Sequence, residues 1–133
     1  MNPYFTLGAR DAAEAAQFYD AVLATIGWSS HASFGTWRGY SRGGSGEGVV
    51  FWSCTPFDGG PATSGNGAMV GFPARSKAEV DNFHAAALAN GGSDEGKPGP
   101  REMYGPDWYS AYMRDPTGNK IGVYLNWPEA KAD

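Results

Sequence analysis

The chain has 133 residues, a net charge of −4 at pH 7 and a pI of about 5.0, which suits one domain with a modest core. No Lys/Arg cluster is long enough to follow a phosphate backbone, and no apolar run is long enough to cross a membrane. Nucleic-acid binding and membrane insertion are therefore not expected. The single cysteine, Cys54, and the lack of a secretory signal pattern favour the cytoplasm.

The first half of the chain predicts one helix and four strands. Residues 4–7 alternate as a strand does, and residues 11–26 carry apolar side chains at helical spacing. Asp11 and Glu14 stand in capping-box positions, and Gly27 is the expected stop of this helix. Further strands are predicted at residues 28–34, 36–41 and 48–55.

The second half repeats this order after a connection rich in glycine and proline at residues 56–67. A strand is predicted at residues 68–72 and a helix at 76–90, with Ser76 and Glu79 at capping-box spacing. Residues 93–107 are again rich in glycine and proline, and we expect at most a short strand there.

The strongest turn signal is Asp115-Pro116-Thr117-Gly118-Asn119, between two runs rich in aromatic and β-branched residues at 108–114 and 120–125. A turn symmetric about Thr117 makes a hairpin in which Tyr112 faces Gly122. Because a glycine weakens a strand, a large side chain or a ligand usually covers it. Tyr112 is the candidate for that side chain.

A shift of 65 residues superimposes the two halves and carries Phe18 onto Phe83. Each half has the order βαβββ, and one half alone would leave a face of its sheet uncovered. The sequence therefore predicts an α+β fold of two such modules within a single domain spanning 1–133. Module one covers about residues 1–60 and module two about residues 65–133.

Four motifs carry a resemblance to a known family: FYDAVL at 18–23, FHAAAL at 83–88, YSAY at 109–112 and DPTGN at 115–119. The chain resembles the vicinal oxygen chelate superfamily, which includes glyoxalase I, extradiol dioxygenases and bleomycin-resistance proteins. The resemblance covers essentially the whole chain. It implies a glyoxalase-like fold, with a curved mixed sheet around a cavity and often a homodimer.

The resemblance also implies where a divalent metal would be held. In the superfamily's enzymes, His and Glu ligands come from positions that correspond here to Tyr4, Met69 and Gly122, with a fourth ligand from the strand at residues 49–54. A phenol, a thioether and a bare α-carbon do not replace carboxylate or imidazole ligands. We therefore expect no metal and no other cofactor.

Without a metal, the cavity becomes a site for an apolar or aromatic small molecule. Strand alternation and the aromatic content predict eight ligand-binding residues: Tyr4, Thr6, Trp52, Met69, Trp108, Tyr112, Gly122 and Tyr124. The alternative is a metal-dependent or metal-free lyase, isomerase or dioxygenase of the same superfamily, for which the sequence identifies no catalytic residue. For His31, His84 and Cys54 we expect ordinary structural roles, and for Arg101 a solvated position in a loop.

Overall fold

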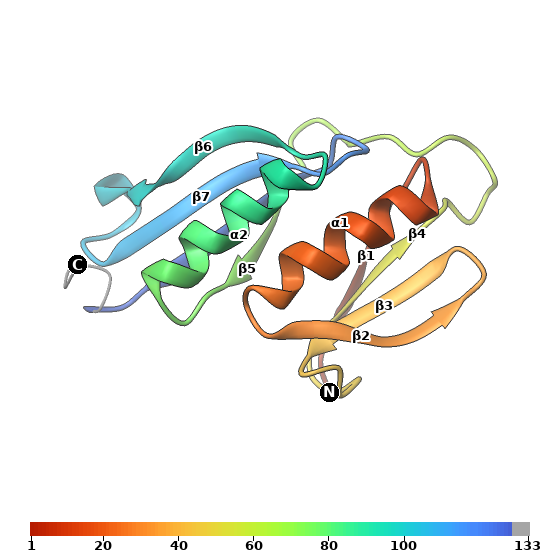
Figure 1. Ribbon diagram of the computed structural model, residues 1–133, viewed down its shortest axis with the longest axis horizontal. Helices are drawn as coiled ribbons and strands as arrows, with labels where there is room; N and C mark the ends of the chain where they lie inside the picture. The colour runs from red at the N-terminus through yellow and green to blue at the C-terminus, as the bar shows by residue number, and fades with distance from the viewer. Residues whose placement is uncertain (129–133) are drawn as a thin grey trace.

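The computed structural model describes residues 1–128 and contains two successive βαβββ modules (Figure 1). Module one consists of β1 (Tyr4–Gly8), α1 (Ala12–Ala24), β2 (Trp28–Phe34), β3 (Trp37–Arg42) and β4 (Val50–Cys54). Module two consists of β5 (Val70–Pro73), α2 (Lys77–Ala89), β6 (Ser93–Pro100), the 3₁₀ turn η1 (Glu102–Tyr104), β7 (Trp108–Arg114) and β8 (Lys120–Asn126). None of the helices within residues 1–128 has the length and apolar character needed to span a membrane.

The two sheets have the same strand order, β1-β4-β3-β2 and β5-β8-β7-β6. In each sheet the first and last strands of the module pair in parallel, and the other neighbours pair antiparallel. Phe18 and Phe83 are both completely buried at matching positions of α1 and α2. The α+β fold of two βαβββ modules is thus confirmed. The two four-stranded sheets remain separate and do not close into a barrel.

Both helices begin where the sequence predicts. The Asp11 carboxylate accepts the backbone N–H of Glu14 at 3.1 Å, and the Ser76 hydroxyl accepts that of Glu79 at 3.2 Å. The first helix ends two residues earlier than predicted, because the N–H groups of Thr25 and Ile26 bond to carbonyls three residues back instead of four. This tight last turn leads into Gly27, whose φ of 81° suits a glycine.

β6 is longer than the sequence suggested, with eight residues at the edge of its sheet. Its pairing with β7 is irregular in two places, between Asp94 and Gly96 and between Gly96 and Gly99. An edge strand tolerates proline and glycine because one row of its backbone groups needs no partner in the sheet. The sequence pattern of regular strands therefore predicted a shorter strand than the eight residues observed.

A single apolar core joins the modules. Figure 1 shows both helices on the same side of the two sheets, and α1 packs against α2. Phe72 of module two lies within 5.6 to 6.1 Å of the rings of Phe5, Phe51 and Trp28 of module one, measured between ring centroids. Because both helices lie on one side of the sheets, the opposite face of each sheet has no helix over it. We call these two faces the open faces.

Candidate functional site

The open face of module two contains a pocket of about 640 Å³. Its lining residues come from the segment before β5, from β6 and η1, and from the β7–β8 hairpin: Met69, Glu95, Gly96, Arg101, Met103, Tyr104, Trp108, Tyr112 and Lys120. We call this the module-two pocket. Its volume lies in the range of small-molecule sites in proteins.

Tyr112 lies directly over Gly122, as the hairpin register predicted. The two residues are paired across β7 and β8. A Cβ atom placed on Gly122 would lie 3.0 Å from Cδ1 and 3.1 Å from Cε1 of Tyr112, which is tighter than nine in ten real Cβ contacts. The glycine therefore lets the phenol ring lie flat on the strand.

A chain of hydrogen bonds runs along this side of β7. The indole Nε1–H of Trp108 donates to the Ser110 hydroxyl at 2.9 Å, and Ser110 donates in turn to the Tyr112 hydroxyl at 3.1 Å. Within residues 1–128, the Tyr112 hydroxyl accepts this bond but has no acceptor for its own hydrogen. That hydrogen is available to a ligand in the pocket.

Two cations flank the Tyr112 ring. The guanidinium carbon of Arg101 lies 5.7 Å from the ring centroid, and the ammonium nitrogen of Lys120 lies 5.9 Å from it. Arg101 is held in place by bonds that it donates to the carbonyl oxygens of Lys97 at 2.6 Å and Gly99 at 2.9 Å. These carbonyls are uncharged, so the positive charge of Arg101 remains available.

The one acid of the pocket is already paired. Glu95 accepts a hydrogen bond from the guanidinium of Arg114 at 2.6 Å, and Arg114 also donates to the carbonyl of Gly118. Arg114 therefore balances the charge of Glu95. The remaining charges, on Arg101 and Lys120, favour an anion.

The other walls are apolar and partly open. Tyr104 meets Trp108 edge to face at 5.8 Å, and Trp108 stacks on Tyr124 at 4.9 Å with the ring planes 11° apart. Met69 and Met103 complete the wall and are 50% and 79% exposed. Methionine side chains adapt to the shape of a bound molecule, so this part of the site suits ligands of varied outline.

The structure brings together the five predicted site residues of module two. Met69, Trp108 and Tyr112 line the pocket, Gly122 lies under Tyr112, and Tyr124 supports Trp108. The three predicted residues of module one lie elsewhere, on the sheet of that module: Tyr4, Thr6 and Trp52. They are not part of this pocket.

Trp52 belongs to an aromatic cluster on the open face of module one. Its ring stacks on Phe34 at 5.4 Å and meets His31 nearly perpendicularly at the same distance. The Nδ1 atom of His31 is 3.1 Å from the Ser41 hydroxyl, which also accepts the N–H of Gly46. His31 is thus held by structural contacts, in line with the role expected for it.

Six lining residues of the pocket were not predicted as site residues from the sequence, and Arg101 and Lys120 matter most because they supply its charge. Lys120 lies two residues before Gly122 on β8, so strand alternation places it on the same side and was a usable signal. Arg101 was expected to be a solvated loop charge. It reaches Tyr112 only because β6 continues to Pro100 and η1 follows, and neither element had a clear sequence pattern.

The side chains present do not fit a metal of the superfamily's usual kind. Tyr4, Met69 and Gly122 offer a phenol, a thioether and no side chain at the corresponding positions. Across the described residues 1–128, no three His, Cys, Asp or Glu side chains are grouped as a metal site requires. We therefore derive no chemistry through a metal.

Comparison with known proteins places the chain in a family. The sequence profile of the Glyoxalase/Bleomycin resistance protein/Dioxygenase superfamily matches residues 3–123. A crystal structure of a glyoxalase/bleomycin resistance protein from Albidiferax ferrireducens is 39% identical, with a TM-score of 0.84 over 92% of this chain and 96% of that one.

Two more distant structures share the fold. A glyoxalase-related enzyme from Fulvimarina pelagi is 20% identical, with a TM-score of 0.73 over 95% of this chain and 88% of that one. Lactoylglutathione lyase from Agrobacterium tumefaciens is 21% identical, with a TM-score of 0.64 over 94% and 92%. No curated protein sequence matches the chain. The chain belongs to the Glyoxalase/Bleomycin resistance protein/Dioxygenase superfamily.

Proposed function

We propose that this protein binds an aromatic small molecule with an anionic group in the module-two pocket. The observation that carries the proposal is the Tyr112 ring, which lies on Gly122 between the side chains of Arg101 and Lys120. The flat ring supplies a surface for stacking, and the two cations supply the charge that an anion needs.

The other contacts of the pocket support the same class of ligand. An aromatic ring against Trp108 or Tyr112 would gain about 0.5–1.5 kcal/mol per good ring contact beyond simple burial. The free hydrogen of the Tyr112 hydroxyl would donate to the anion, and a hydrogen bond to a charged group contributes about 1.5–3 kcal/mol. Met69 and Met103 would close over the apolar part of the ligand.

Binding of 2-naphthoate, measured by calorimetry beside its uncharged analogue 2-naphthamide, tests this proposal. The Arg101→Gln variant is expected to bind naphthoate at least about tenfold more weakly, the equivalent of losing one charge contact of about 1.4 kcal/mol. Its affinity for naphthamide should hardly change. Arg10→Gln is the control, because Arg10 is exposed and pairs with Glu14 outside the pocket. Naphthoate binding that is unaffected by Arg101→Gln would contradict the proposal.

A metal-free enzyme of the superfamily is the second candidate, and the Tyr112 hydroxyl favours it. A hydroxyl that accepts from Ser110 and keeps its own hydrogen can act as a general acid. Mass spectrometry of bound aromatic acids after prolonged incubation separates the two functions. Conversion that is lost in Tyr112→Phe would establish an enzyme, whereas unchanged ligand supports binding alone.

We further propose that the protein is a homodimer in which the open faces of two chains cover each other. Tyr4, Phe34 and Met103 are 71%, 65% and 79% exposed, which leaves large apolar side chains on both open faces. Twofold dimers are by far the commonest soluble homo-oligomers, and such pairing would cover these surfaces.

We also propose a reducing, cytoplasmic setting, which the buried free thiol of Cys54 suits.

Light scattering is expected to give about twice the chain mass of 14.1 kDa at micromolar concentration. Replacing Phe34 with Ser on the open face should shift the population toward single chains. Phe57→Ser is a comparison variant in the loop after β4, where the side chain is 96% exposed and sits outside the sheets. A mass of one chain for the unaltered protein would contradict the dimer.

A further inference from the structure

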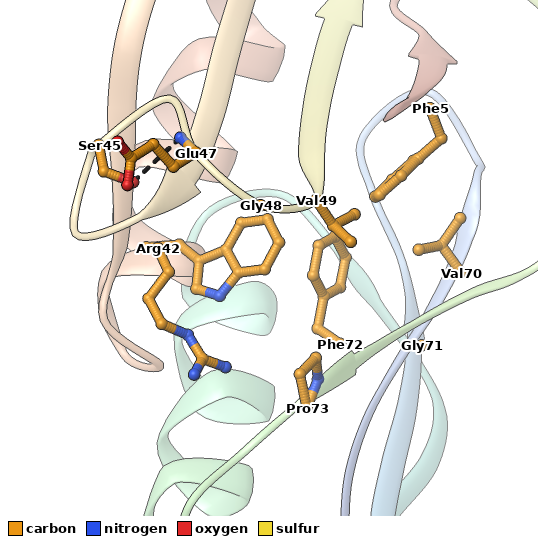
Figure 2. A pocket seen from close by; sticks show the side chains of 11 residues that line it. Phe5, Arg42, Ser45, Glu47, Gly48, Val49, Val70, Gly71, Phe72 and Pro73 are labelled. Atoms are coloured by element: carbon orange, nitrogen blue, oxygen red, sulfur yellow. Dashed lines mark hydrogen bonds between the residues drawn. The ribbon is translucent and has the colours of Figure 1, made fainter. Parts of the chain in front are cut away.

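A second pocket, of about 530 Å³, lies where the two modules meet (Figure 2). Its walls come from Phe5 of β1, from Trp28 at the start of β2, from all four residues of β5, and from the segment at residues 42–49. We call it the junction pocket. It shares no lining residue with the module-two pocket, so it is a separate place for a ligand.

The inner wall of the junction pocket continues the apolar core. Phe72 is 1% exposed and meets Trp28 edge to face at 5.6 Å, while Phe5 stacks on Phe51 at 5.2 Å. Val70 packs against the same core from β5. An apolar group that enters here would leave water for a surface of rings and branched side chains.

Trp28 supplies a hydrogen-bond donor that the fold does not use. The side chain is 94% buried (6% exposed), and its indole Nε1–H has no acceptor among the described residues. Leaving a buried donor without a partner is costly, and such groups in native proteins call for a physical reason. A ligand that brings an acceptor to this wall would supply the missing bond.

Two opposite charges stand at the rim. Figure 2 shows Arg42 and Glu47 on one side of the junction pocket, with Phe5 and Val70 across from them. Within residues 1–128 neither charged side chain forms an ion pair. Arg42 is therefore free to hold an anion, and Glu47 would oppose one placed beside it.

Glu79, the carboxylate on which the charge of Arg42 acts, already forms hydrogen bonds with Arg75. Partial burial acts to raise the pKa of Glu79, but hydrogen bonds from Arg75 and, more weakly, the charge of Arg42 hold it below its usual value. Arg75 donates to both carboxylate oxygens of Glu79. Glu79 is therefore bonded to Arg75 and not to Arg42, and within residues 1–128 the guanidinium of Arg42 has no ion-pair partner.

We propose that the junction pocket binds an apolar carboxylate, whose chain lies on Phe72 and Val70 and whose carboxylate is held by Arg42 and the Trp28 N–H. Trp28 and Arg42 both belong to the lining of one apolar pocket, and the buried indole N–H of Trp28 has no partner among the described residues. A carboxylate accepts from both, whereas a neutral apolar molecule would leave the Trp28 donor unpaired. This site is independent of the aromatic ligand proposed for module two.

The test is a titration with octanoate, followed through the indole N–H resonances of the ¹⁵N-labelled protein. The Trp28 resonance is identified by its absence in Trp28→Phe, and the Trp108 resonance reports on the module-two pocket in the same spectra. Octanoate is expected to move the Trp28 resonance downfield in a saturable way. The uncharged analogue octanamide should bind at least about tenfold more weakly, because it gives Arg42 no charge to hold.

Charge variants at the rim make the test specific. Arg42→Gln should weaken octanoate binding by about tenfold and leave octanamide unchanged, while Glu47→Gln should strengthen octanoate binding about two- to threefold. Arg10→Gln, remote from the pocket, is the control. A Trp28 resonance that does not move, a saturable shift of Trp108 alone, or equal effects of Arg42→Gln on both compounds would overturn the proposal. Arg10, Arg42 and Glu47 are exposed, so the charge variants leave the core intact, and the buried Trp28 is replaced only to identify its resonance.

Discussion

Replacing Asp115 with alanine is expected to lower the free energy of unfolding by about 3–5 kcal/mol. For a domain of this size, that corresponds to a fall in melting temperature of roughly 10–20 °C. Asp115 is 5% exposed and accepts five hydrogen bonds, from three backbone N–H groups of its own turn, from the Asn119 amide and from the Tyr19 hydroxyl. Alanine would leave buried donors without a partner.

The hydrogen bond from Tyr19 means that replacing Asp115 would also remove a contact between the two modules. Tyr19 lies on α1 of module one, its hydroxyl is 2.6 Å from the Asp115 carboxylate of module two, and Asn119 also donates to the carbonyl of Gly8. Burial, reinforced by the charge of Asp115, raises the pKa of Tyr19 well above its usual value of 10. The hydroxyl therefore keeps its proton and remains a donor at any ordinary pH. Asp115 thus fastens the two modules at this end of the core.

Thermal and urea unfolding of three variants would check this expectation. Tyr19→Phe removes one bond to a charged group and should cost about 1.5–3 kcal/mol, less than Asp115→Ala. Asp58→Ala is the matched control, since Asp58 is exposed and, among the described residues, accepts only the N–H of Gly60 in its own loop. Its effect should stay within about 0.5 kcal/mol. If Asp115→Ala were no more destabilising than Asp58→Ala, the carboxylate would not join the modules.

Of the contacts that Asp115 makes, the sequence predicts those within its turn but not the one with Tyr19. The turn role of Asp115 followed from the local pattern, because its partners at residues 117–119 are close in sequence. The partnership with Tyr19, 96 residues away, depends on how α1 packs against the other module. No local pattern records such a distance, although the apolar spacing of the helix did predict that Tyr19 faces the core.

The same division applies to the candidate site. Hairpin register gave Tyr112 opposite Gly122, and alternation placed Met69, Trp108 and Tyr124 on one side of the sheet. These predictions rest on the two-residue period of a strand, which a sequence shows directly. The position of Arg101 rests on an irregular edge strand and a 3₁₀ turn, whose geometry depends on tertiary contacts. The aromatic floor of the site and the side of the sheet on which Lys120 lies could therefore be predicted, whereas the position of Arg101 could not.

The position of Gly122 links the pocket to the chain's departure from the superfamily pattern. The glutamate expected there by resemblance would need a Cβ atom, and the Tyr112 ring lies 3.0 Å from where that atom would be. A side chain at residue 122 therefore requires the Tyr112 ring to shift by a few tenths of an ångström. Restoring a metal ligand at this position would first require the ring to move.

Replacing Gly122 with leucine is accordingly expected to abolish binding of 2-naphthoate and to destabilise the fold by about 1–3 kcal/mol through overpacking. The larger side chain must displace the Tyr112 ring, which removes the stacking surface and the hydroxyl from between Arg101 and Lys120. Calorimetry measures the first effect and thermal unfolding the second.

The neighbouring Gly71 provides the control. It pairs with Gly122 across β5 and β8, but a Cβ atom there would meet only Tyr124, at 3.8 Å, an ordinary contact. Gly71→Ala should therefore leave both stability and naphthoate binding nearly unchanged, while Gly122→Ala already disturbs Tyr112. In the double variant Tyr112→Ala/Gly122→Leu the lost ring makes room for leucine, so part of the stability should return without any return of binding. A Gly122→Leu protein that binds naphthoate as tightly as the unaltered chain would show that the ligand does not lie on Tyr112.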